Sequence, residues 1–347
     1  MIGHLNDSQY DIINTANSSV LDKSLGRPST RDDILFIMYG VLVPLVVFFG
    51  YVGNVMTVVV LQKKTMKPIT SIYLQALVFS DIAFITCAFI ALSMPILLAT
   101  CLDPDIGLNV FNTRGYIAIN FFLMTSLLCN EYILVLVSID RYVCVCHSQK
   151  HTQIFSRTKV ILSIIGVVCF SAIYNIPRIV AVKIEVSPCS NTSASVTCYS
   201  VLMTEFGESF LYQKVYAVWI YAVVNFVIPL MVIVNLNIPI VRKLWRKQIK
   251  CKRLGMRRNS AKDHVTLVLI LIMAIFALIQ TLGFINQVYY TYSLEDSHST
   301  TYLVDVVNVL YVINSSINFI IYIAIGEKFR TTFSQLVQAR CIKKTGQ

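Results

Sequence analysis

The sequence predicts an all-α membrane protein: a seven-transmembrane helix bundle followed by a short amphipathic helix 8. Hydrophobic residues make up 56% of the 347 residues and charged residues only 14%. The mean hydropathy is +0.68, which excludes ordinary soluble domains. A helix that crosses a hydrocarbon core about 30 Å thick needs roughly 20 mostly apolar residues. Five runs without Asp, Glu, Lys or Arg reach this length: 34–62, 82–102, 215–241, 264–294 and 306–326.

Two further segments complete the seven helices. Residues 115–139 are interrupted only by Glu131, and 160–177 form an 18-residue run. Hydrocarbon offers no partner to backbone N–H and C=O groups, so each run must be helical, and the alternation that a β-barrel needs is absent. We therefore expect one transmembrane domain over 34–325, with helices at about 34–62, 69–100, 115–144, 159–181, 214–241, 264–292 and 302–325.

The distribution of Lys and Arg predicts the orientation of the bundle. The side that holds loops 62–68, 141–159 and 242–263 and the C-terminal tail carries 22 of the 29 basic residues. Because short loops rich in these residues stay in the cytoplasm, we expect an extracellular tail over 1–33 and a cytoplasmic segment over 326–347. The tail 1–33 lacks the apolar core of a signal peptide, so the first helix is expected to direct its own insertion, with the plasma membrane as destination.

Three glycosylation sequons agree with this orientation. Asn6, Asn17 and Asn191 fall in segments predicted to be extracellular, where glycans can be attached. A fourth match, at Asn314, lies inside a predicted membrane helix, where no glycosyltransferase can reach it.

Three carboxylates at membrane depth need an explanation, because an ionisable group there costs about 2.5–3.5 kcal/mol. They are Asp81, Glu131 and Asp140. Asp140 is followed by Arg141, whose guanidinium can pair with it or, when freed, donate a fork of hydrogen bonds to a partner's carbonyls. Around Asp81 we expect a buried polar cluster of asparagines, which could also hold a sodium ion: Asn54, Asn130, Asn314 and Asn318.

Asp140-Arg141-Tyr142 stands at the predicted cytoplasmic end of the third helix, where it resembles the Asp/Glu-Arg-Tyr motif of rhodopsin-like (class A) G-protein-coupled receptors. Other segments between 34 and 335 resemble signatures of that family: Gly53-Asn54-Val55, Leu77 to Asp81, Pro229 and Asn318-Phe319-Ile320-Ile321-Tyr322. The resemblance implies a receptor that activates a heterotrimeric G protein by helix rearrangement and that could also bind arrestin. It implies a coupling switch made of Asp140, Arg141, Tyr142, Asn318 and Tyr322.

Two longer motifs narrow the resemblance. Asn314-Ser-Ser-Ile-Asn-Phe-Ile-Ile-Tyr322 and Tyr174-Asn-Ile-Pro-Arg178 are similar to segments of invertebrate FMRFamide-type neuropeptide receptors. This implies a short amidated peptide as the extracellular ligand. The predicted extracellular segments hold 13 acidic residues against seven basic ones, a balance that steers cationic ligands towards that face.

The chain also departs from the family pattern. Three signature positions are replaced: Phe319 stands for Pro, Tyr116 for Cys and Asn237 for Tyr. The sixth helix reads Ile279-Gln280-Thr281-Leu282 in place of Cys-Trp-x-Pro. Without that Pro a backbone hydrogen bond is restored, so we expect a straighter sixth helix. At the foot of this helix Asp263 is a candidate partner for Arg141.

The resemblance places candidate ligand contacts as well. Leu123 occupies the position of the Asp of amine receptors and Val312 that of the Lys of opsins, so small amines and retinal are not favoured. Glu208 could close a cavity between the sixth and seventh helices from above. Four polar side chains either line this cavity or form interhelical hydrogen bonds without touching ligand: Gln280, Gln287, Asp305 and Asn308.

Three cysteines are expected in the oxidising extracellular space, so one of them must stay without a partner from this set. Either Cys189 pairs with Cys198 and closes a hairpin in the second outer loop, or Cys101 pairs with one of the two. No metal site is expected, because the nearest candidates lie at a reducing helix end without tight ligand pairs: Cys144, Cys146, His147 and His151.

The basic loop and the C-terminal segment predict further interactions. Loop 242–263 carries ten basic residues, which suits contact with anionic membrane lipid and docking of a G protein. Within it, Arg257-Arg258-Asn259-Ser260 resembles a basophilic kinase site, so Ser260 is a phosphorylation candidate. The stretch 327–337 has an amphipathic period suited to a helix lying on the membrane. Cys341 beyond it is either palmitoylated or an ordinary reduced thiol.

Two other classes of function stay open. A chemosensory receptor for a small molecule, or a receptor-like protein that no longer couples, would fit the unusual sixth helix. A transporter or channel would use Asp81 and Glu131 to line an ion path, but the odd number of helices and the lack of inverted repeats argue against it. The sequence contains no hydrolase, kinase or nucleotide-binding constellation, so we expect neither an enzyme nor a nucleic-acid-binding protein.

Overall fold

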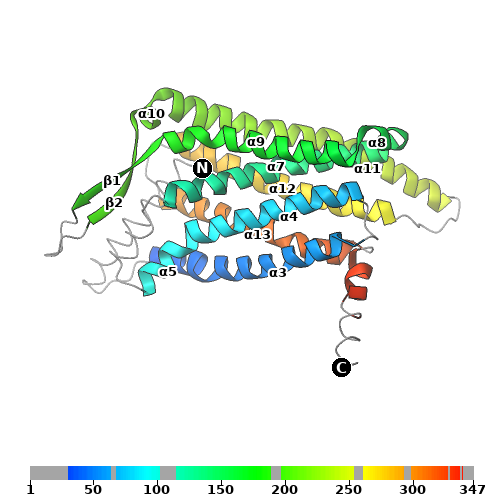
Figure 1. Cartoon of the computed structure of the whole chain (residues 1–347), viewed down its shortest axis with the longest axis horizontal. Coiled ribbons are helices and arrows are strands. Elements are labelled where there is room, and N and C mark those ends of the chain that lie inside the picture. Colours follow the sequence, from blue (N-terminus) through cyan, green and yellow to red (C-terminus); the bar gives the residue numbers. More distant parts are fainter. Residues whose placement is uncertain are drawn as a thin grey trace.

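The computed structural model describes residues 30–63, 68–101, 115–188, 197–253, 261–292, 298–326, 329–336 and 338. They form a bundle of long helices with a two-stranded hairpin at one end (Figure 1). Six spans in this part are long and apolar enough to cross a membrane: Asp33–Leu61, Ile69–Leu98, Gly115–Cys146, Arg157–Val180, Leu211–Cys251 and Leu303–Ala324. The shorter apolar stretch Ile270–Asn286 belongs to a further long helix, so the predicted seven-helix bundle is present.

Several of the seven helices combine α-helical and π-helical turns. The first runs through α2 (Thr30–Leu35), η1 (Phe36–Leu42) and α3 (Val43–Leu61), and the second through α4 (Pro68–Ala88), η2 (Phe89–Ser93) and α5 (Met94–Cys101). The fifth runs through η3 (Leu211–Ile220), η4 (Ala222–Val227) and α11 (Ile228–Arg253). The others are α7 (Gly115–Cys146), α9 (Arg157–Val180), α12 (Ala261–Tyr292) and α13 (His298–Ile325), with short helices α8 (Ser148–Ile154) and α10 (Glu205–Glu208) between them.

The third helix, α7, lies at the centre of the bundle. It contacts α4, α9 and α11. Most residues of its apolar stretch are buried, whereas most residues of the apolar stretch of α9 are not. The outer face of α9 carries exposed apolar side chains, among them Leu162, Ile165, Val168 and Ile173. Exposed apolar side chains along a long helix are solvated by hydrocarbon, so α9 lies at the lipid-facing rim of a multi-pass membrane protein.

Small residues let the first and seventh helices approach each other closely. A Cβ atom added to Gly50 would clash with Ser316 Oγ, and one added to Gly53 would lie 2.9 Å from Phe319 Cβ. A larger residue at either position would therefore push α13 away from α3. This close approach brings Asn54 of α3 within hydrogen-bond reach of the α13 backbone.

The two ends of the bundle differ. At the hairpin end, β1 (Val182–Pro188) and β2 (Thr197–Met203) form an antiparallel pair in which Val182 lies opposite Met203. The opposite end, where the last turns of α7 carry Arg141, is called the Arg141 end. There residues 329–336 form a short helix, and the Phe329 ring packs on Tyr322 with 5.4 Å between ring centroids. The hairpin and the α8 segment stand at opposite ends of the long axis (Figure 1).

Candidate functional site

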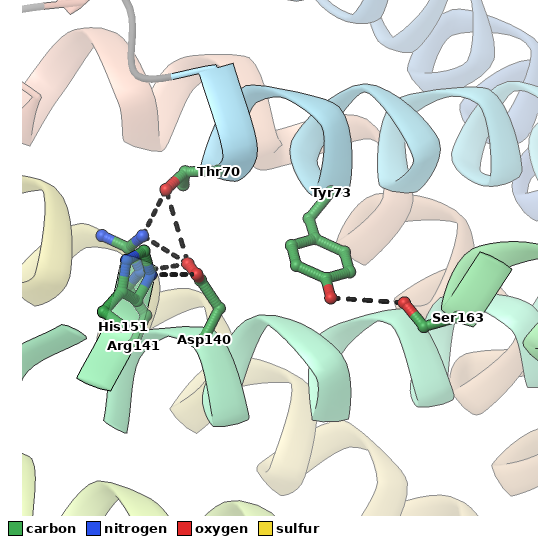
Figure 2. Close-up of polar contacts among 6 residues, drawn as sticks. All are labelled: Thr70, Tyr73, Asp140, Arg141, His151 and Ser163. Carbon is green, nitrogen blue, oxygen red and sulfur yellow. Dashed lines mark hydrogen bonds and ion pairs between the residues drawn. The ribbon is translucent and has the colours of Figure 1, made fainter. Parts of the chain in front are cut away.

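The described structure places a buried arginine at one end of α7, where it is bonded to two neighbours, one of which also binds a histidine. Arg141 is 2% exposed and Asp140 is fully buried. Arg141 Nε donates to Asp140 Oδ2 at 3.0 Å, and its Nη2 donates to the same oxygen and to the Thr70 hydroxyl of α4. His151 Nε2 lies 2.8 Å from Asp140 Oδ1. Figure 2 shows Thr70, Arg141 and His151 gathered around the Asp140 carboxylate, and we call these four residues the Arg141 cluster.

Three helices deliver the members of the Arg141 cluster. Asp140 and Arg141 belong to the last turns of α7, Thr70 to the first turn of α4, and His151 to α8. Beside the cluster, the Tyr73 hydroxyl lies 3.2 Å from Ser163 Oγ and links α4 to α9 (Figure 2). Because the guanidinium is buried and engaged within the protein, it can bind another protein only after these bonds break.

Some predicted members of the switch lie outside this cluster. Tyr142 is half-buried, and its ring packs on His147 with 5.5 Å between centroids. Tyr322 of α13 is buried, and its hydroxyl has no hydrogen-bond partner among the described residues. The side chain of Asp263 lies outside the described residues, so the pairing with Arg141 is untested.

A second polar cluster surrounds Asp81 in the middle of the bundle. Asn130 of α7 donates to Asp81 Oδ1 at 3.0 Å, and Asn318 of α13 donates to Oδ2 at 2.8 Å. Asn54 of α3 donates to the Ser315 carbonyl at 3.1 Å. The structure therefore brings together four of the five residues that the sequence grouped. Asn314 is only half-buried, and it gives the Asp81 carboxylate no hydrogen bond within the described part of the chain.

The Asp81 cluster contains oxygen atoms suited to a small cation. The side-chain oxygens of Asn54 and Asn130 are buried and have no hydrogen-bond partner among the described residues. Hard cations prefer carboxylate and amide oxygens as ligands. Asp81, Asn54 and Asn130 thus fit the sodium ion that the sequence led us to consider.

A third cluster joins three helices at Gln280, in the segment of the sixth helix that the sequence marked as unusual. Gln280 of α12 donates to Glu131 Oε1 of α7, and the Tyr311 hydroxyl of α13 donates to Gln280 Oε1. Glu131 is 1% exposed, and its Oε2 has no hydrogen-bond partner among the described residues. In this conformation Gln280 forms an interhelical link, the second of the two roles considered for it.

Two further predicted ligand contacts also lie together. The Tyr39 hydroxyl of η1 donates to Asp305 Oδ1 at 2.8 Å, and Asn308 Nδ2 donates to the Tyr39 oxygen at 3.3 Å. Tyr39 is fully buried. Tyr39 was not among the predicted site residues, although a tyrosine hydroxyl at membrane depth must find a hydrogen-bond partner and so indicates a polar site.

The remaining predicted site residues either lie apart from these clusters or lie outside the described residues. Leu123 and Val312 are buried in the apolar core towards the hairpin end, and Glu208 of α10 is exposed. Among the described residues no group of His, Cys, Asp and Glu could hold a metal ion. Cys101 and Cys198 are described only in their backbones, so the disulfide pairing stays open. Outside the described residues lie Asn6, Asn17, Cys189, Asn191, Ser260, Cys341 and the side chain of Gln287.

Comparisons with known proteins agree with this arrangement. Residues 53–322 match the model of the "7 transmembrane receptor (rhodopsin family)". The "FMRFamide receptor" of Drosophila melanogaster is 27% identical over 306 residues, which cover 86% of this chain and 54% of that protein. Two Caenorhabditis elegans proteins are 25% identical to this chain. The match to the "Probable G-protein coupled receptor frpr-1" covers 87% of this chain and 79% of that protein. The match to the "FMRFamide peptide receptor frpr-18" covers 85% of this chain and 68% of that protein.

The chain spans about half the length of its Drosophila relative. The family match, however, covers most of this chain and all the residues of the Arg141 cluster, of the Asp81 cluster and of the third cluster, which is made of Glu131, Gln280 and Tyr311. Together with the seven-helix bundle, it establishes that the chain belongs to the rhodopsin family of seven-transmembrane receptors.

Proposed function

We propose that the protein is a plasma-membrane G-protein-coupled receptor for an amidated neuropeptide related to FMRFamide. The observation that carries the proposal is the Arg141 cluster, in which a guanidinium suited to binding carbonyls is kept buried by intramolecular bonds. Relatives named as FMRFamide receptors support the choice of ligand class. A receptor of this kind carries a signal and catalyses no covalent chemistry.

The proposed orientation puts the N-terminus and the hairpin end outside the cell and the Arg141 end in the cytoplasm. The basic residues support it, because the segments that the sequence assigns to the cytoplasmic side hold 22 of the 29. On α11 this side carries exposed cations: Arg242, Lys243, Arg246, Lys247 and Lys250. Such a surface suits anionic lipid and the docking of a heterotrimeric G protein or an arrestin.

The proposed mechanism is a shift between two states of the bundle. Peptide bound at the hairpin end stabilises an arrangement in which the fifth to seventh helices have moved relative to α7. This movement separates Gln280 from Glu131 and frees Arg141 from Asp140 and Thr70. The freed guanidinium then donates to carbonyls of the G protein.

A sodium ion, as we propose, stabilises the resting state of this receptor. Asp81 would supply the negative charge, and the amide oxygens of Asn54 and Asn130 would complete the set. The ion would supply a positive charge that offsets the buried carboxylate between α4, α7 and α13. Movement of these helices would then weaken its binding.

The modifications predicted from the sequence belong to the same proposal. Glycans at Asn6, Asn17 and Asn191, and one disulfide among Cys101, Cys189 and Cys198, would lie on the outer side. Phosphate on Ser260 and a palmitoyl chain on Cys341 would lie on the cytoplasmic side. Peptide mass spectrometry without reduction would reveal the disulfide, and finding all three thiols free would rule it out.

The proposed ligand class can be tested with matched peptides. Cells that express the receptor are exposed to a panel of amidated peptides, each paired with its free-acid form, while calcium and cAMP are recorded. We expect at least one amidated peptide to act at a far lower concentration than its acid. Responses to small odorants or amines, with none to peptides, would favour the chemosensory alternative instead.

A further inference from the structure

The fourth helix ends in a buried cation that the proposed switch does not use. Arg178 lies in the last turn of α9 and is 8% exposed. Its Nε–H has no hydrogen-bond partner among the described residues. Within the described part of the chain Arg141 forms an ion pair with Asp140, and no ion pair joins Arg178 to a described carboxylate. Arg178 therefore has no counter-charge among the described residues, and a buried guanidinium without an anion is unfavourable.

Aromatic rings surround the guanidinium of Arg178. Its central carbon lies 5.6 Å from the ring centroid of Tyr216 and 5.9 Å from that of Tyr221. The Tyr216 ring in turn packs on Tyr174 and Tyr212, with 5.5 and 5.4 Å between centroids. Cation–π attraction stabilises the cation in part, but no ring carries a full negative charge. We call Arg178 and these four tyrosines the Arg178 cage.

The hydrogen bonds within the Arg178 cage leave donors rather than acceptors available. The Tyr174 hydroxyl oxygen accepts from Asn225 Nδ2 at 2.9 Å, and the Arg178 guanidinium also hydrogen-bonds the Tyr174 and Tyr216 hydroxyls, whereas no described residue accepts from the Tyr174 O–H. The Tyr216 hydroxyl already donates to the Tyr174 carbonyl at 2.6 Å. Arg178 Nε–H and the Tyr174 O–H therefore offer two donors in one buried place.

The Arg178 cage lies at the hairpin end of the bundle. The helix that carries Arg178 ends at Val180, and β1 begins at Val182. Phe206 of α10 packs on Tyr212 with 5.4 Å between ring centroids. Figure 1 shows α10 beside this end of α9, so the cage lies next to the α10 turn on the side where the proposed function puts the ligand.

We propose that the Arg178 cage binds a carboxylate group of the ligand. A planar carboxylate matches the fork of a guanidinium and can accept the additional Tyr174 hydrogen bond. That the carboxylate belongs to a ligand rests on the proposed receptor function, which the inference deepens. An amidated peptide would supply it from an Asp or Glu side chain, since its C-terminus is neutral.

Thermal unfolding of the purified receptor tests the cage without the natural ligand. The probes are N-acetylphenylalanine, which joins a carboxylate to an aromatic ring, and its neutral amide. We expect the carboxylate to raise the unfolding temperature as its concentration rises, because it binds the folded state, and the amide to raise it far less. Arg178→Gln should remove the shift. Lys214→Gln, which removes an exposed cation from η3, should retain it.

The inference is overturned by equal shifts with acid and amide, by no shift in the wild-type protein, or by a shift that survives Arg178→Gln. If that variant does not fold, Tyr174→Phe takes its place. It removes the phenol hydroxyl, and with it both the O–H donor and the acceptor of the Asn225 bond, and should weaken carboxylate binding roughly fivefold. Unchanged binding by a folded Tyr174→Phe receptor would contradict the two-donor arrangement.

A second arm uses signalling cells and separates this inference from the proposed function. Phe-Met-Arg-Phe-amide is extended at its N-terminus by Asp or by the neutral Asn. The wild-type receptor should respond to the Asp peptide at a roughly tenfold lower concentration, and Arg178→Gln should respond to both alike. If neither peptide acts on the wild type, the peptide proposal fails, while the thermal arm still decides whether the cage takes a carboxylate.

Discussion

Arg141 is held by Asp140 and Thr70, and His151 binds the same Asp140 carboxylate; only Asp140 is adjacent to Arg141 in the sequence. The motif Asp140-Arg141 predicted the ion pair between chain neighbours. Thr70 lies 71 positions away and His151 lies 11 positions from Asp140, and neither belongs to a recognisable pattern. Their contacts depend on how α4 and α8 pack on α7, so the sequence could predict the acid and the cation but not the residues that restrain them.

Replacing Thr70 tests whether these bonds keep the receptor at rest. Thr70→Val removes the hydroxyl and keeps the shape, so Arg141 loses one partner in the resting state only. A hydrogen bond to a charged group contributes about 1.5–3 kcal/mol, which predicts a roughly tenfold rise in the active fraction without ligand. Ligand-independent nucleotide exchange on a G protein, measured in membranes, reports this rise.

Matched variants control for general damage to the helix end. Thr70→Ser keeps the hydroxyl and should keep the basal rate low. Ser163→Ala breaks the nearby bond to Tyr73 without touching Arg141 and should also leave the basal rate unchanged. A rise in all three variants would mean that loosening of α4, rather than release of Arg141, increases activity.

The Asp81 cluster makes a prediction about sodium. Asp81→Asn keeps the size of the side chain but removes the charge that would hold the ion between Asn54 and Asn130. Wild-type basal exchange should be lower in sodium chloride than in potassium chloride of equal ionic strength, and the variant should show no difference. Sodium sensitivity that persists in Asp81→Asn would place the ion elsewhere.

At the scale of the element, the sixth helix departs most from its family and is joined to its neighbours by polar bonds. The sequence predicted a straighter helix from the missing Pro, and α12 is described as one continuous helix from Ala261 to Tyr292. Apolar length predicted that the fifth helix ends at about 241, whereas α11 continues to Arg253. The residues of this extension are mostly polar, so a criterion based on apolar length could not detect it. Periodicity gave no sign of the π-helical turns of η3 and η4.

Gln280 should stabilise the packing of α12 against α7 and α13. Gln280→Leu leaves Glu131 and Tyr311 buried without this partner, and each such group costs about 1–3 kcal/mol. The unfolding temperature of the purified receptor should therefore fall clearly below that of the wild type. Leu278→Ala, at a side chain 63% exposed on the same helix, should cause little change. Equal losses in the two variants would contradict a specific role for Gln280.

At the scale of the whole molecule, the bundle has two chemically different ends joined by a polar interior. Charge-free runs and family motifs predicted the seven helices and the central place of Asp81, because both depend on local sequence and bilayer thickness. The pairing of Asp305 with Tyr39, and the enclosure of Arg178 by tyrosines of the fourth and fifth helices, depend on side-chain packing between distant helices. No pattern in one sequence predicts such contacts.

The central claim is that peptide binding at the hairpin end releases Arg141 at the other end. It is tested most directly by measuring peptide binding and G-protein nucleotide exchange on the same purified receptor, wild type and Arg141→Ala. We predict that the variant binds an active amidated peptide with an affinity within about threefold of the wild type, since Arg141 lies far from the ligand, yet fails to stimulate exchange. Full peptide-stimulated exchange by Arg141→Ala would contradict the account.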